Sequence, residues 1–553
     1  MSTVRVVTVL LLLTACGPAP AAVTPAAEAI TTARAPALSS GAPPRDVFAP
    51  NGPLEREALP ATLAFPLKTI QLGAAAAAVD PVPQACSAYL SRKAVVTTCD
   101  HRAEALEALE AALAERQPAS RDAALKGVER CASLPPGLVR ALRAEAAPVA
   151  CGDALTQTLV ARPPAGIDGA VYDTLAGIAI GARLWRAVKT PPKAKRPYDK
   201  KHLKKYFSNA MMPWARAQAT AIQQLATQGA QLRYYGRAIV ALEAGMADLR
   251  FIDVVRTVPI PDTYRGDAGL TNAYYGSLEA ALDPRKQRGR DATLVGLGQL
   301  ASIGVIRDPR VDRARRALSR MYGGRAIDAL DRLMLPPLSP STATNSEQRL
   351  AARLPTFYAG LLFAGQAAKD PAFLRQLLEK GIAPQHRIAL ATADLPLSVR
   401  KLYGRARFEL AQTYWRKVDI DEMLRLFGKI PVAQRDSDDK LFLALGLALQ
   451  DGPSNAADMM VSAPLSELGI GNTAALDNIG SSQDTHAAMA AFDSALIAQL
   501  AAPATAPASY WRDVAKRYRK AAERLRDPLQ RQDALKLAED ADQTAMHIKK
   551  RGQ

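Results

Sequence analysis

The sequence has little aromatic content, few histidines and no cysteine beyond Cys151. Phe, Trp and Tyr together make up 5% of the chain, and there are five histidines. The sequence motifs of serine hydrolases, zinc proteases, phosphate-binding loops and dinucleotide-binding loops are all missing. No Cys-x-x-Cys pair is present and His101 is the only histidine between Cys86 and Cys151, which argues against a zinc site. We therefore predict no catalytic residue, no metal site and no cofactor.

The first apolar run of the chain, residues 6–13, is too short to cross a bilayer. It follows Arg5 and ends in Leu-Thr-Ala-Cys, which is the layout of a cleaved secretion signal over residues 1–15. These last four residues resemble the lipobox of bacterial lipoproteins. The resemblance implies that Cys16 becomes the first mature residue and carries the lipid, and an ordinary signal peptide with a chance cysteine is the alternative. Gly17 in place of Asp favours the outer membrane, with the protein facing the periplasm.

The chain is strongly basic, with 71 Lys and Arg against 53 Asp and Glu and a formal charge of +18. In an exported protein this surplus predicts anionic envelope material as a partner, and it does not predict nucleic acid. Residues 17–60 are dominated by Ala, Pro, Thr and Ser and hold almost no large apolar side chains. Because such a segment buries too little surface to offset the entropy of ordering it, we predict a tether over residues 16–60 that starts at the lipidated cysteine.

Four further cysteines, Cys86, Cys99, Cys131 and Cys151, lie close together in the sequence. An even, clustered set in an exported protein predicts two disulfides. Three connectivities are possible, and sequential pairing, Cys86 with Cys99 and Cys131 with Cys151, is the simplest of them. Apolar residues at helical spacing, interrupted by prolines, predict helices around these cysteines. Residues 61–165 are thus expected to form a disulfide-stapled helical subdomain.

Helix pairs that end at proline dominate residues 166–553. Four segments, 235–259, 357–384, 403–431 and 442–464, each have a polar or glycine-containing turn in the middle, and Tyr-Gly-Arg-Ala opens two of them. One such unit cannot bury its apolar face alone, whereas stacked units bury it together. The pattern resembles tetratricopeptide-like or HEAT-like repeats, which implies an all-α, right-handed α-solenoid. A non-repetitive helical bundle is the alternative.

The densest charge lies in residues 189–205, which hold eight Lys and Arg against one Asp, with Tyr198, Tyr206 and Phe207 among or beside them. Two interpretations stay open: a solvated linker whose prolines prevent helix formation, and a surface that binds anionic lipid or wall polymer. The candidate contact residues of that surface are Lys193, Lys195, Arg196, Lys200, Lys201, Lys204 and Lys205.

Together these patterns predict an envelope lipoprotein without catalytic activity. We expect a helical-repeat scaffold or adaptor that binds a protein partner in an envelope complex near the membrane. Outer-membrane assembly lipoproteins and the lipoprotein activators of wall synthases use comparable repeats. The alternative is a cell-wall or polysaccharide-processing enzyme similar to the superhelical lytic transglycosylases, which requires an isolated Glu in a cleft.

Overall fold

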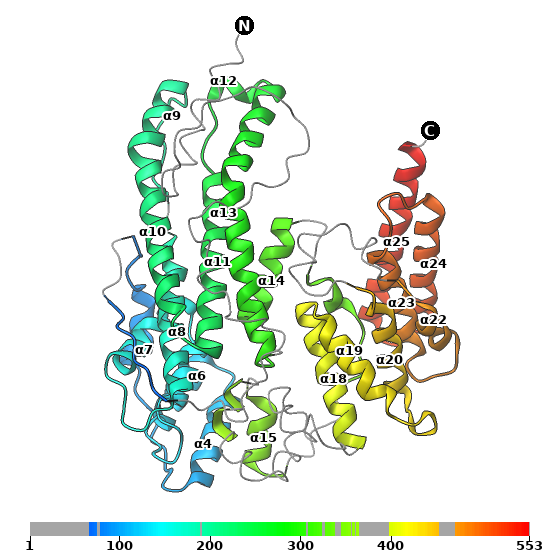
Figure 1. Ribbon diagram of the computed structural model, residues 1–553, viewed down its shortest axis with the longest axis horizontal. Helices are drawn as coiled ribbons and strands as arrows, with labels where there is room; N and C mark the ends of the chain where they lie inside the picture. The colour runs from blue at the N-terminus through cyan, green and yellow to red at the C-terminus, as the bar shows by residue number, and fades with distance from the viewer. Residues whose placement is uncertain are drawn as a thin grey trace. The chain divides into compact units, whose positions relative to one another are not determined.

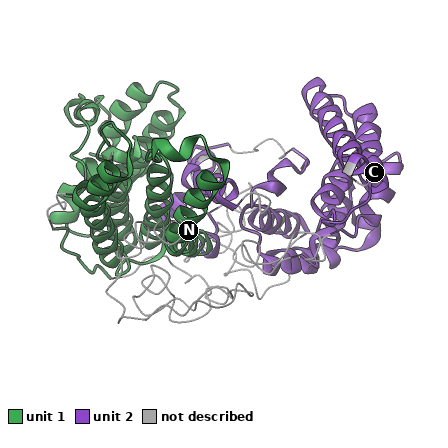
Figure 2. Ribbon diagram, turned by 90° about the horizontal axis from the view of Figure 1, so that it is seen from above, with its two compact units in different colours: residues 1–54, 64–300 green, residues 55–63, 301–553 purple. Residues whose placement is uncertain are grey.

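The computed structural model describes residues 66–73, 78–188, 191–305, 308–322, 327–337, 344–354, 357–359, 361–363, 397–452 and 471–551. Within these ranges the protein consists of α-helices with short 3-10 and π turns, and no residue lies in a strand (Figure 1). The predicted all-α fold is confirmed, while the right-handed sense of the solenoid stays a prediction. The protein divides into two compact units, and the boundary between them in the sequence lies between Leu300 and Ala301 (Figure 2). No helix in the described part of the chain has both the length and the apolar content needed to span a bilayer.

Unit 1 is built around one buried helix, α8. The helices of this unit are α3 (Ser87–Ser91), α4 (Arg102–Ala114), α5 (Pro118–Val128), α6 (Leu138–Ala146), α7 (Gly152–Ala161), α8 (Gly169–Ala187), α9 (Lys200–Tyr206), α10 (Met212–Gly229), α11 (Tyr234–Arg256), α12 (Asp262–Arg265) and α13 (Ala268–Ser302). Nearly every residue of α8 is buried, and the helix packs against α6, α7, α10 and α11. A helix with apolar residues around its whole circumference is buried in this way, and its charged residues Arg183 and Arg186 lie against the carboxylate of Asp153.

The closest approach in unit 1 is the crossing of α8 and α11 at Gly177 and Gly236. A Cβ atom on Gly177 would lie 2.4 Å from the carbonyl oxygen of Gly236, and a Cβ on Gly236 would lie 2.0 Å from the carbonyl oxygen of Asp173. Both glycines therefore allow the two backbones to touch. Further along, Arg250 of α11 donates to the carbonyl oxygen of Leu184 near the end of α8, so the two helices run in the same direction.

The predicted helix pair over residues 235–259 is wrong, because α11 runs unbroken from Tyr234 to Arg256. The sequence suggested a turn at residues 245–248, where Gly245 and Asp248 interrupt the apolar pattern. Instead Asp248 is fully buried and accepts hydrogen bonds from Arg285 and Arg288 of α13 at 2.7 to 2.8 Å. Its charge is neutralised by another helix, so the polar residue does not end the helix.

The sequence-based boundary near residue 165 lies inside unit 1. Helices α7 and α8, on either side of it, pack against each other. The buried ion pair between Asp153 and Arg186, at 2.7 Å, also joins the two sides. The helices that carry the cysteines therefore share one core with the helices that follow.

Unit 2 consists of helical hairpins. Its helices are α14 (Pro309–Tyr322), α15 (Ser346–Arg353), α18 (Leu397–Tyr414), α19 (Lys417–Gly428), α20 (Ser437–Leu449), α22 (Ala474–Ser481), α23 (Ala487–Leu500), α24 (Ala508–Arg524) and α25 (Pro528–Arg551). The helix pair expected over residues 403–431 is confirmed by α18 and α19, which pack together. Phe408, Phe427 and Phe442 join α18, α19 and α20 through ring contacts of 5.5 Å. Residues 453–470 and most of 357–384, where the two other expected pairs fall, lie outside the described residues.

Candidate functional site

The four clustered cysteines form two disulfides, Cys86–Cys151 and Cys99–Cys131. The sequential pairing expected from the sequence is therefore wrong. Cys99 precedes α4 and Cys131 follows α5, and these two helices pack as a hairpin that brings its two ends together. Cys86 ends a 3-10 turn that lies against the start of α7, where Cys151 stands. Cys16, the predicted lipidation site, lies outside the described residues.

Residues 66–73 and 78–86 form a strap that lies along α8. The backbone N–H of Ile70 donates to the Tyr172 hydroxyl at 2.9 Å, near the start of the helix. Arg183 donates to the carbonyl oxygen of Gly73 at 2.7 Å, nearer its end. The strap thus follows α8 in the direction of the chain before Cys86 fixes it to Cys151. The strap is the first segment of the chain that the structure describes.

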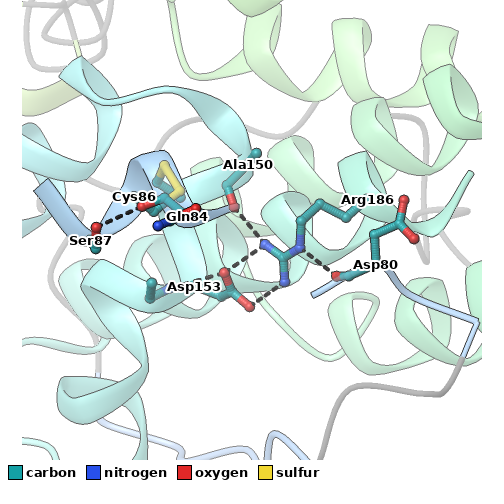
Figure 3. The surroundings of a disulfide bond; sticks show 9 residues. Asp80, Gln84, Cys86, Ser87, Ala150, Asp153 and Arg186 are labelled. Atoms are coloured by element: carbon teal, nitrogen blue, oxygen red, sulfur yellow. Dashed lines mark hydrogen bonds and ion pairs between the residues drawn. A yellow bond between two sulfur atoms is a disulfide. The ribbon is translucent and has the colours of Figure 1, made fainter. Parts of the chain in front are cut away.

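Arg186 fastens the last part of the strap (Figure 3). Its guanidinium donates to the carbonyl oxygen of Asp80 at 2.9 Å, to that of Ala150 at 2.6 Å, and to both carboxylate oxygens of Asp153 at 2.7 and 2.8 Å. All of these groups lie beside the Cys86–Cys151 disulfide. One cation therefore links the strap, the start of α7 and the end of α8.

The second candidate feature is the basic segment that was predicted to bind an anionic surface. The structure places the described residues of this segment on the surface of unit 1. The prediction of a linker without helix is wrong for Lys200–Tyr206, which forms α9. Its N-terminus is capped by Asp199, whose side chain accepts from the backbone N–H of His202 at 2.8 Å, while Leu203 is its buried residue. The prolines stand before this cap and do not interrupt the helix. The seven candidate residues are all exposed: Lys193, Lys195, Arg196, Lys200, Lys201, Lys204 and Lys205.

Helices α12 and α13 add aromatic and apolar side chains to the same end of unit 1, where α9 and α12 lie (Figure 1). The backbone N–H of Asp262 donates to the carbonyl oxygen of Tyr198 at 2.9 Å, which joins the basic segment to α12. The ammonium group of Lys200 lies 5.2 Å from the ring centre of Tyr264, and that ring contacts Tyr274 at 6.4 Å. We call residues 193–206 and 262–275 together the basic-aromatic end.

Cation–aromatic contacts and two exposed apolar side chains complete the basic-aromatic end. Arg196 and Arg265 both lie over the Tyr198 ring, at 5.6 and 5.5 Å from its centre. Leu270 and Tyr275, in the first turns of α13, are 36% and 41% exposed. Sequence reasoning missed the contribution of α12 and α13, because their charge is low and they lie far from the basic segment in the chain.

A cavity of about 370 Å³ lies between α5, α6 and α7. The acidic group on its wall is Glu129, whose carboxylate accepts from Arg140 at 2.6 and 2.8 Å and from Arg143 at 3.3 Å. Two guanidinium groups therefore hold this carboxylate in place. A general acid in a polysaccharide-cleaving enzyme must instead be free to give a proton to the substrate.

Another glutamate, Glu243 on α11, is fully buried, and its carboxylate lies 3.9 Å from the guanidinium of Arg250. A side chain with no exposed surface cannot contact a polymer in solution. No group of three metal-ligating side chains gathers within the described ranges.

Comparison of the chain with protein-family models, with curated proteins and with solved structures gives no match.

Proposed function

We propose that the protein is an envelope lipoprotein that acts as a non-catalytic helical scaffold or adaptor. In this proposal the lipid on Cys16 holds it at the outer membrane, facing the periplasm, and its helical body binds a protein partner of an envelope complex. The observation that carries the proposal is the strap. A segment that follows a predicted lipid anchor and tether is fixed to the core by a disulfide, Cys86–Cys151, and by the hydrogen bond from Arg186 to the carbonyl oxygen of Asp80.

The cavity wall supports a scaffold over the alternative, a polysaccharide-processing enzyme. The glutamate on the wall of the cavity, Glu129, is already paired with two arginines. Three other buried carboxylates of unit 1 are also engaged by guanidinium groups: Asp122 by Arg143, Asp153 by Arg186 and Asp248 by Arg288. Pairs of this kind join neighbouring helices and occupy the carboxylate oxygens with structural contacts.

The test of the proposed function compares the wild type with Cys16→Ser in cells. We expect the wild type to fractionate with the outer membrane and to incorporate labelled palmitate, and the variant to do neither. In-cell crosslinking should then recover the same protein partner from repeated preparations of the wild type and much less of it from the variant. Digestion of purified wall by the purified protein, with no partner recovered, would instead establish the enzyme.

A further inference from the structure

We propose that the basic-aromatic end is a second membrane-contact site, which binds the surface of a bilayer that contains anionic phospholipids. This inference rests on the proposed location in the envelope. It does not depend on lipidation of Cys16 or on the identity of a protein partner.

The first argument is the charge of this end. Residues 193–206 and 262–275 hold eight Lys and Arg and three Asp. All three carboxylates are engaged: Asp199 caps α9, Asp262 lies 3.6 Å from Arg265, and Asp267 accepts from the backbone N–H of Leu270 at 3.0 Å. With these three carboxylates counted, the end still carries a formal net charge of +5, the difference between its eight Lys and Arg and its three Asp.

The lysines themselves are directed to solvent. None of the six pairs with a carboxylate of the described residues: Lys193, Lys195, Lys200, Lys201, Lys204 and Lys205. Each basic residue close to an anionic bilayer contributes about 1 kcal/mol, which corresponds to about a fivefold change in affinity. A cluster of this size is therefore sufficient for measurable binding at moderate salt.

The second argument distinguishes a bilayer from a polar wall polymer. The end carries five of the 15 tyrosines of the chain, of which Tyr264 and Tyr274 are buried in its core while Tyr198, Tyr206 and Tyr275 are partly or fully exposed. Tyrosine rings next to lysines suit the boundary between lipid head groups and acyl chains, where the ring meets apolar material and the ammonium group meets phosphate. Leu270 and Tyr275 are exposed apolar groups on α13 that can enter this boundary. A polar wall polymer offers the cations a partner but offers the exposed aliphatic side chain of Leu270 none.

The experiment measures sedimentation of the full-length protein carrying Cys16→Ser, so that no acyl chain contributes, with vesicles of phosphatidylethanolamine and phosphatidylglycerol. Vesicles of phosphatidylcholine are the uncharged reference. In this background we compare the fourfold variant Lys200→Gln, Lys201→Gln, Lys204→Gln and Lys205→Gln with a control of equal charge change on α24 and α25. The control variant is Lys516→Gln, Lys536→Gln, Lys549→Gln and Lys550→Gln, at four exposed positions of unit 2.

We expect the α9 variant to lose on the order of several hundredfold in affinity for phosphatidylglycerol vesicles, since the loss of about fivefold per lysine is multiplied over four lysines, and the control variant to bind like its parent. Leu270→Gln with Tyr275→Gln, which changes no charge, should weaken the binding that remains at high salt. Equal losses in the two lysine variants would overturn the site. Binding of the parent to purified wall and not to vesicles would overturn the bilayer in favour of a polymer. If the Leu270 and Tyr275 variant binds like its parent at every salt concentration, these residues do not enter the lipid, and that step of the argument is refuted.

Discussion

Replacing Asp248 by Asn should be among the most destabilising single changes of charge in unit 1. The Asp248 carboxylate is fully buried on α11 and is held by three hydrogen bonds of 2.7 to 2.8 Å from Arg285 and Arg288. Removing one partner of a buried ion pair costs about 3 to 5 kcal/mol, because the remaining charge stays in a poorly solvated place. Arg285 and Arg288 are 10% and 23% exposed, so water can reach them in part and the lower end of that range applies.

We therefore expect a loss of about 3 kcal/mol in the free energy of unfolding, and a fall of roughly 6–12 °C in the Tm of unit 1, at 2–4 °C per kcal/mol. The matched control is Asp253→Asn on the same helix, whose side chain is 61% exposed and lies 3.9 Å from Arg256. An exposed pair of this kind contributes less than about 1 kcal/mol.

Urea unfolding followed by circular dichroism measures both variants, and hydrogen exchange of α11 peptides locates the change. The pH dependence gives a second check. Burial alone would raise the pKa of Asp248, but the positive charges and hydrogen bonds of Arg288 and Arg285 outweigh it and hold the pKa below its ordinary value. A lowered pKa in the folded state means that the stabilisation is present above about pH 4, the unfolded pKa, and disappears as the pH falls further. Equal stability of the two variants at neutral pH, or a difference that persists in strong acid, would refute this reasoning.

Three other predictions follow from unit 1. Burial raises the pKa of Asp173 to about 7, in spite of the hydrogen bond from the backbone N–H of Arg233. The protonated carboxyl therefore favours the folded state fully below about pH 4, the unfolded pKa, and this stabilisation is lost as the pH rises through 7. The stability of Asp173→Asn relative to the wild type should therefore rise between these pH values in urea titrations, and a difference independent of pH would contradict the assignment. Mild reduction should open Cys99–Cys131 before Cys86–Cys151, because Cys86 and Cys151 are 1% and 2% exposed whereas Cys99 is partly exposed. Alkylation and peptide mass mapping measure the order of opening. The reverse order would contradict this prediction. Gly236→Ala should lower the free energy of unfolding by about 3 kcal/mol, because its Cβ would overlap the backbone of Asp173. Gly276→Ala, whose Cβ would have no atom within 4 Å, should instead stabilise α13 by up to about 1 kcal/mol. Similar melting temperatures for the two variants would disprove the close crossing of α8 and α11.

The sequence predicts local structure well wherever the signal is local. The turn between α18 and α19 and the proline that opens α25 both follow from residues within a few positions of the break. The repeated Tyr-Gly-Arg-Ala also has a physical basis, because its glycine allows a close neighbour in each case. Gly236 touches the backbone of α8, and a Cβ on Gly404 would lie 2.6 Å from the ring of Phe427.

What the sequence does not reveal depends on partners far along the chain. Asp248 looks like part of a turn until Arg285 and Arg288 are placed beside it. The disulfide pairing depends on how the hairpin of α4 and α5 folds, and four cysteines alone leave three possibilities open. At the candidate site, the seven basic residues are visible in the sequence, but the approach of Tyr264 and Tyr274 to Lys200 is not.

The direction of α8 and α11 adds a constraint on how the two proposed membrane contacts can act together. The strap meets α8 near Tyr172, at the end where α11 begins, and the basic-aromatic end follows the other end of α11. Since α11 has 23 residues, the two points are separated by about 34 Å at 1.5 Å per residue. A flexible chain of about 44 residues, as the composition of residues 17–60 predicts, has a root-mean-square span of roughly 33–40 Å. The predicted tether is thus long enough for the basic-aromatic end to reach the membrane in which the proposed lipid on Cys16 would be anchored.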